Sequence, residues 1–148
     1  MDIINILEEG IRLKREGKYE EAKQKYIEVI NIDKKEKMAY YNLGKVLYIL
    51  GDYNASVNSY KIAYEMGVDS FNVLIHMGHS LNDCKYESGK YKDIINDYKN
   101  GIDPYRSHQQ TIQGKYRKSN LSMNKYKELN DEYRNLCISS AMDYLNQK

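Results

Sequence analysis

The sequence contains little proline, cysteine and phenylalanine, and no tryptophan. Its 148 residues include 1 Pro, 2 Cys, 1 Phe and 9 Gly. A sandwich or barrel of many short strands needs frequent turn residues, so the shortage of Pro and Gly argues against both. No apolar run approaches the ~18 residues of a membrane-spanning helix, so no membrane partner is expected. The remaining expectation is one water-soluble domain, with 41% hydrophobic and 30% charged residues.

Motifs for catalysis are also missing. The sequence has no phosphate-binding glycine loop, no G-x-S-x-G, no H-E-x-x-H and no C-x-x-C. His76 and His79 lie near Asp83 and Cys84, but no second pair of ligands follows. Ordinary helix-surface histidines are therefore favoured over a metal site. We expect no enzyme, no metal and no cofactor.

Neither sign of charge dominates, because 23 Lys and Arg residues nearly balance 21 Asp and Glu residues and the net charge is only +2. The basic residues after position 104, including residues 115–118 (KYRK), fall short of the dense Lys/Arg stripe of a nucleic-acid binder. Cys84 and Cys137 lie far apart and are expected to be reduced thiols, and residues 1–9 contain no basic leader. Both features favour a cytoplasmic location.

Internal repetition is the strongest positive signal. Residues 17–26 (GKYEEAKQKY) recur after 34 residues as residues 51–60 (GDYNASVNSY), and after a further 38 as residues 89–98 (GKYKDIINDY). A period near 34 with helical patterning on both sides of the glycine predicts a helix–turn–helix repeat.

The residues around these glycines resemble the tetratricopeptide repeat (TPR) family, whose pattern is W-x₂-L-G-x₂-Y, then A-x₃-F, then P. The second repeat matches best, at Tyr40, Leu43, Gly44, Leu47, Ser56 and Tyr60. The resemblance implies an all-α fold, a right-handed α-solenoid of three helix–turn–helix units and a C-terminal helical cap. Residues 1–148 then form a single TPR domain, with repeats at about 3–36, 37–70 and 71–104, a connector at 105–120 and a capping helix at 121–148.

The glycines fall into two groups. A mid-helix Gly costs ~1 kcal/mol relative to Ala, which is reasonable only where a neighbouring helix comes close; this group is Gly10, Gly44 and Gly78. The other group ends the first helix of each repeat, where a left-handed residue is favoured; it is Gly17, Gly51 and Gly89.

The last segment predicts an amphipathic helix, with apolar residues at three- and four-residue steps. We expect it to cover the apolar end of the stack. Its apolar face is Tyr126, Leu129, Tyr133, Leu136, Cys137, Ala141, Tyr144 and Leu145.

The resemblance places a binding surface on the inner face of the first helices. We name this set the first-helix surface; it begins with Ile4 and continues with Leu7, Ile11, Lys14, Arg15, Met38, Tyr41, Asn42, Lys45, Tyr48, Ile49, Ile75 and His79. Its apolar and aromatic residues suit an extended peptide or an amphipathic helix of a protein partner, with the cations selecting the ligand's polarity. The expected function is a non-enzymatic protein–protein interaction module: an adaptor, a scaffold or a chaperone-like protein.

Other interpretations remain open. The C-terminal helix or a second copy of the chain could fill the groove, and the apolar first helix (Ile3, Ile4, Ile6 and Leu7) could pair two chains in a homo-oligomer. A nucleic-acid contact through residues 105–118 is a minor alternative. A clamp for the carboxylate of a chaperone's C-terminus is disfavoured, because Leu7 and Ile11 occupy two of the positions where that clamp needs charged or polar donors.

Overall fold

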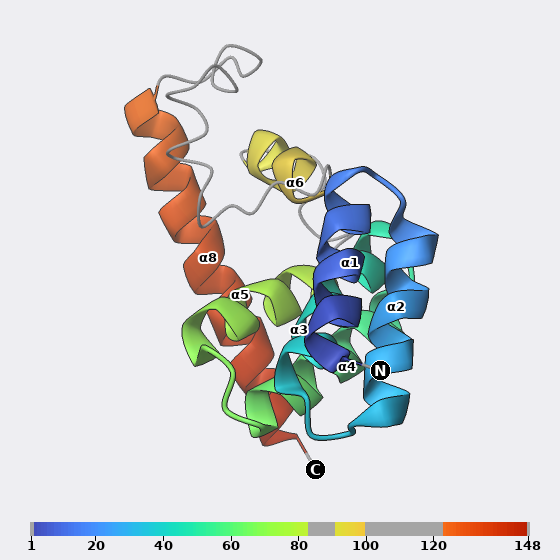
Figure 1. Ribbon diagram of the computed structural model, residues 1–148. Coiled ribbons are helices and arrows are strands. Elements are labelled where there is room, and N and C mark those ends of the chain that lie inside the picture. Colours follow the sequence, from blue (N-terminus) through green and yellow to red (C-terminus); the bar gives the residue numbers. More distant parts are fainter. Residues whose placement is uncertain (1, 83–90, 100–122, 148) are drawn as a thin grey trace.

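The structure, a computed structural model, describes residues 2–82, 91–99 and 123–147. All regular secondary structure in these ranges is α-helical (Figure 1), as expected. None of these helices is long and apolar enough to cross a membrane. The helices are α1 (Ile3–Arg15), α2 (Tyr19–Ile32), α3 (Lys37–Ile49), α4 (Tyr53–Glu65), α5 (Ser70–Leu81), α6 (Lys92–Lys99) and α8 (Met123–Asn146).

The ends of α1 and α3 are fixed by glycines in the left-handed conformation. Gly17 has φ 81° and Gly51 has φ 89°, which confirms the prediction for these two positions. The backbone N–H of Lys18 donates to the carbonyl of Leu13 at 2.9 Å, closing the last turn of α1. This bond from C″ to C3 belongs to the Schellman motif, which satisfies carbonyls that the helix end leaves unpaired. Gly89 lies outside the described residues.

Close packing within the first two helix pairs depends on the mid-helix glycines. A Cβ atom at Gly10 would lie 2.6 Å from the ring of Tyr26, and one at Gly44 would lie 2.8 Å from the ring of Tyr60. Both rings are buried, with 0% and 1% exposure. The prediction that these glycines admit a neighbouring helix is confirmed, and the neighbour's tyrosine fills the space.

Consecutive helix pairs pack against each other as in TPR repeats, which confirms the all-α fold of stacked helix pairs. Helix α1 pairs with α2 and α3 pairs with α4, while α2 also contacts α3 and α4 contacts α5. One hydrophobic core extends from the first helix pair into the second. In it, Leu43 and Val46 of α3 pack with Ala22 and Tyr26 of α2. The exact boundaries of the repeats stay a prediction.

The structure differs from the sequence expectation at α5. The repeat pattern predicts that its partner helix lies within residues 89–104, yet α8 packs along α5 (Figure 1). Helix α6 contacts α8 instead. Gly78 of α5 faces the backbone of Cys137 in α8, so a Cβ atom there would overlap the Cys137 carbonyl. The mid-helix glycine of α5 therefore admits a close helix, as predicted, but that helix is the C-terminal one.

Helix α6 contributes to a small core beside this contact. Ile94 and Ile95 are buried, and they cluster with Ile75 of α5 and with Leu129 and Tyr133 of α8. The proposed connector at 105–120, the basic residues 115–118 and Pro104 lie outside the described residues.

Candidate binding surface

The first-helix surface exposes its apolar residues mainly at the starts of α1 and α3. Ile4 is 66% exposed and Met38 is 37% exposed, although both are large hydrophobic residues. Leu7 and Ile11 of α1 and Ile49 of α3 are half-buried. These side chains give the described part of α1 and α3 an accessible apolar strip.

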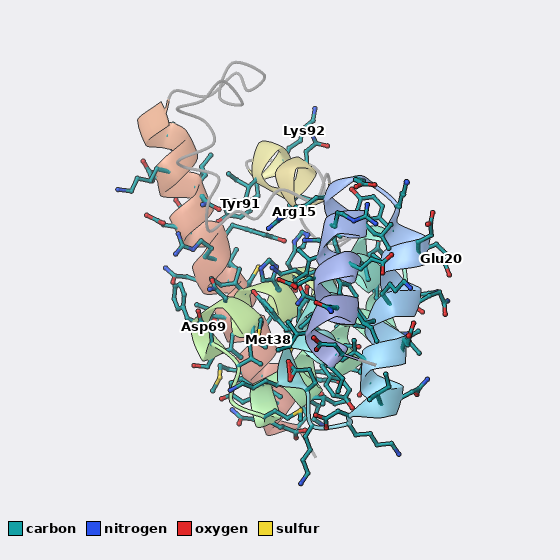
Figure 2. The ribbon with its side chains drawn as sticks, in the orientation of Figure 1. Arg15, Glu20, Met38, Asp69, Tyr91 and Lys92 are labelled. Carbon is teal, nitrogen blue, oxygen red and sulfur yellow. The ribbon has the colours of Figure 1, made fainter. Side chains whose placement is uncertain are left out.

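The cations of this surface lie toward the other ends of the same helices. Lys14 and Arg15 occupy the last turn of α1, and Lys45 lies in the second half of α3. Figure 2 shows the separation, with Met38 near the start of α3 and Arg15 at the far end of α1, toward α6. The Nζ atom of Lys45 stands 4.5 Å from the centre of the Tyr41 ring, a cation–π contact.

Tyr41 and Tyr48 are buried and do not face a ligand, which corrects the expectation that they belong to a binding surface. Their exposures are 8% and 6%. The ring of Tyr41 lies edge-on to the rings of Tyr60 and His76, with distances of 6.0 Å and 5.9 Å between the ring centres. The centres of the Tyr48 and His79 rings are 4.4 Å apart. These tyrosines join successive helix pairs, because aromatic rings of α3, α4 and α5 meet around them.

Asn42 is also buried, and its amide is already engaged. Its Nδ2 atom donates to the backbone carbonyl of Met38 at 2.9 Å, one turn earlier in α3. An amide that bonds its own helix is a poorer donor for an incoming carboxylate. This contact adds to the argument against a carboxylate clamp, since Leu7 and Ile11 provide no donor.

Ile75 and His79 lie beneath other helices, which is a second correction. Each is 1% exposed. The Nδ1 atom of His79 forms a 2.6 Å hydrogen bond with the hydroxyl of Tyr133 in α8, and Ile75 clusters with side chains of α6 and α8. In this structure α8 and α6 therefore cover the α5 part of the first-helix surface.

The expectation of surface histidines is wrong for both residues. His76 is 8% exposed and stacks on Tyr60 at 5.8 Å, and His79 is enclosed by Tyr48 and Tyr133. Among the described residues, no group of three His, Cys, Asp or Glu side chains could hold a metal ion. Asp83 and Cys84 lie outside the described residues.

Cys137 is a free thiol with 0% exposure. Burial raises the pKa of this thiol to about 12, so it stays protonated at neutral pH. A protonated, inaccessible thiol is neither a nucleophile nor a metal ligand. Cys137 was predicted to lie on the apolar face of the last helix, and its burial in α8 agrees with that placement.

Two polar partners of α5 were missed from the sequence. Tyr133 was expected only as an apolar residue of the cap, and Ser140 lies off the predicted apolar face. Ser140 exchanges two hydrogen bonds with the side-chain amide of Asn82: Nδ2 donates to its Oγ at 2.8 Å, and its Oγ donates back to Oδ1 at 3.2 Å. No local signal links residues 58 positions apart in the chain.

A family model described as a TPR repeat matches residues 10–51. Residues 10–51 are therefore similar to a tetratricopeptide repeat. The matched stretch runs from Gly10 in α1 to Gly51 after α3. It includes nine of the thirteen residues of the first-helix surface. A search of the curated proteins finds no match to the chain. TPR repeats are generally protein–protein interaction modules.

Proposed function

We propose that this TPR chain is a non-enzymatic module that binds a segment of a protein partner on the α1–α3 part of the first-helix surface. The observation that carries the proposal is the exposure of Ile4 and Met38, 66% and 37%. They lie 34 residues apart, one full repeat, so the same position of two successive first helices presents an apolar side chain. A repeated position provides matching contacts for a helix or an extended peptide.

The charges suggest which segment fits. Apolar side chains lie at the starts of α1 and α3. Lys14, Arg15 and Lys45 lie toward the other ends of these two helices. The complementary partner carries apolar anchors at one end and carboxylates at the other. Such charges set the orientation and the association rate more than the affinity, and salt weakens them.

The apolar anchors set the scale of affinity. Complete burial of an Ile or Met side chain contributes about 1.5–3 kcal/mol, so covering the exposed parts of Ile4 and Met38 contributes on the order of 2 kcal/mol together. Each 1.4 kcal/mol is a factor of ten in Kd, so the pair accounts for a factor of about 30. Micromolar binding then requires further contacts, for which the half-buried Leu7 and Ile11 are available.

A phage-displayed library of random peptides tests the proposal. Peptides selected on the wild-type chain are measured against an Ile4→Ser, Met38→Ser variant, and we expect Kd to rise by at least tenfold. The matched control is Ile32→Ser, since Ile32 is 49% exposed but lies on α2, the second helix of its pair. Binding that is unchanged in the double variant, or equally weakened in the control, contradicts the proposal. Substitutions of Tyr41 and Tyr48 do not test binding, because removing these buried rings would weaken the fold itself.

A second candidate is pairing of two chains through the same apolar residues of α1. The exposure of Ile4 supports it, since large apolar side chains on a surface often mark an interface. Light scattering over a range of concentrations separates the two. A dimer that dissociates on Ile4→Ser supports pairing, whereas a concentration-independent monomer rejects it.

A cytoplasmic location is part of the same proposal. The buried free thiol of Cys137 supports it, because reduced cysteines are usual in a reducing compartment.

A further inference from the structure

Five aromatic rings follow one another from the second helix pair to the contact between α6 and α8. They are Tyr53 of α4, Tyr48 of α3, His79 of α5, Tyr133 of α8 and Tyr91, which precedes α6. The centres of successive rings are 5.3, 4.4, 5.7 and 5.5 Å apart. Rings with such spacings are in direct contact. We call these five residues the aromatic row.

The aromatic row is accessible at one end. Tyr53 is half-buried, whereas the other four members are buried. At the far end, Tyr91 lies between α6 and α8 (Figure 2). A reagent in solution therefore meets this row at Tyr53. It can change an inner ring only if the change passes from ring to ring, and an electron can do so without any movement of the helices.

A short hydrogen bond joins the phenol of Tyr133 to the imidazole of His79. The hydroxyl oxygen of Tyr133 and Nδ1 of His79 are 2.6 Å apart. A phenol that loses an electron becomes a strong acid, and a base within about 2.6–3.2 Å takes up its proton directly. A neutral imidazole provides such a base at the ring nitrogen that carries no proton. With its proton on Nε2, His79 presents Nδ1 to the hydroxyl of Tyr133.

Two other buried tyrosines are less suited to lose an electron. The hydroxyl of Tyr26 has no hydrogen-bond partner among the described residues, so no base stands ready for its proton. The hydroxyl of Tyr91 donates to the carboxylate of Glu132 at 3.0 Å. An imidazole is a stronger base than a carboxylate by about two pKa units. Within the row, the proton of Tyr133 therefore has a stronger acceptor than the proton of Tyr91.

We propose that the aromatic row carries one-electron oxidation from Tyr53 to Tyr133, where a neutral tyrosyl radical is held beside the imidazolium of His79. The reagent is a one-electron oxidant of the class of organic peroxyl radicals. Tyr133 loses one electron and its O–H bond. The electron passes along the row to the peroxyl radical, which becomes a peroxide anion and takes a proton from water. The phenol proton forms an N–H bond at Nδ1 of His79.

Photogenerated tris(bipyridine)ruthenium(III), a one-electron oxidant that takes up no proton, tests the proposal on the full chain at pH 7. Electron paramagnetic resonance of samples frozen at intervals after the flash gives the formation rate and the lifetime of the tyrosyl radical. We expect the lifetime in the wild type to exceed that in Tyr133→Phe by at least tenfold. His79→Phe should shorten it as much, because it keeps Tyr133 but removes the base.

Two further variants separate the path of the electron from its destination. Tyr53→Phe should slow the formation of the long-lived radical at least fivefold and leave its lifetime unchanged, because Tyr53 is the accessible end of the row. The matched control is Tyr26→Phe, which makes the same change at another ring with 0% exposure, outside the row. It should alter neither the rate nor the lifetime.

The wild type also provides a measurement that needs no substitution. The transferred proton lies on the hydrogen bond to the radical oxygen, so electron–nuclear double resonance should detect one strongly coupled proton that is lost in protein prepared in D₂O. A radical without this coupling, or one centred on sulfur, overturns the proposal even if a variant fails to fold. Equal lifetimes in the wild type and Tyr133→Phe, an equal effect of Tyr26→Phe, or an unchanged rate in Tyr53→Phe also overturns it. None of these results depends on the phage-display test.

Discussion

Replacing Tyr26 by Phe should stabilise the protein, although Tyr26 is a central residue of the first helix pair. Its side chain is 0% exposed, and its hydroxyl is buried without a hydrogen-bond partner among the described residues. A buried hydroxyl that lacks a partner costs about 1–3 kcal/mol. Phe keeps the ring that fills the space at Gly10 and removes this cost.

The expected gain is about 1 kcal/mol in the free energy of unfolding at pH 7, or roughly 3 °C in Tm. It should increase at alkaline pH. Burial raises the pKa of the Tyr26 phenol to about 12, against an ordinary value of 10.0. Between pH 10 and 12 the unfolded chain therefore loses this proton before the folded chain does, and the wild type loses stability as pH rises. Phe has no proton to lose, so its advantage grows by roughly 1 kcal/mol at pH 11.

Urea unfolding followed by circular dichroism at 222 nm measures both effects, since the chain has no Trp for fluorescence. The matched control is Tyr133→Phe, which makes the same change at another residue with 0% exposure. It removes the hydroxyl bonded to His79, so it should destabilise by about 1–3 kcal/mol. A loss of stability in Tyr26→Phe at pH 7, or an advantage that does not change between pH 9 and 11, would refute the reasoning.

Substitutions at three further positions separate packing, backbone strain and capping in the second helix pair, all measured by urea unfolding. Gly44→Ala should destabilise by roughly 1–2 kcal/mol, because the added Cβ atom meets the buried Tyr60 ring, and Gly44→Asn should be worse. Gly51→Ala should cost about 1–2 kcal/mol through its φ of 89° alone, and Gly51→Asn should cost less, since Asn tolerates this conformation; equal costs for Ala and Asn would argue against strain. Asp52→Ala should lose about 1 kcal/mol, because the Asp carboxylate accepts from the backbone N–H of Ala55 at the start of α4. A neutral result there would show that the cap contributes nothing.

The repeat period allowed much of the first two helix pairs to be predicted. Gly10 and Gly44 were expected to admit a neighbouring helix, and Gly17 and Gly51 were expected to end one, and the structure shows both. These features are local, because a left-handed residue or a missing side chain acts within one turn or one hairpin. The TPR match to residues 10–51 covers the same region.

The candidate surface was predictable only in part. Ile4 and Met38 are exposed on the first helices, whereas Tyr41 and His79 are buried. A repeat pattern assigns a residue to one face of a helix, and it cannot show whether another segment covers that face. The burial of Tyr41 depends on rings from α4 and α5, and the burial of His79 depends on α8.

The sequence by itself determined the helical class, the period of the repeats and the places where helices end or approach closely. Each of these follows from residues within about 34 positions of one another. Only the tertiary structure decided which helix lies on α5. Two segments, residues 89–104 and α8, were candidates for the same face, and α8 is the one that packs there. The comparison depends on contacts such as those of His79 with Tyr133 and of Asn82 with Ser140, which join residues more than 50 positions apart. Local periodicity contains no information about such contacts, because residues so far apart in sequence meet only in the folded chain.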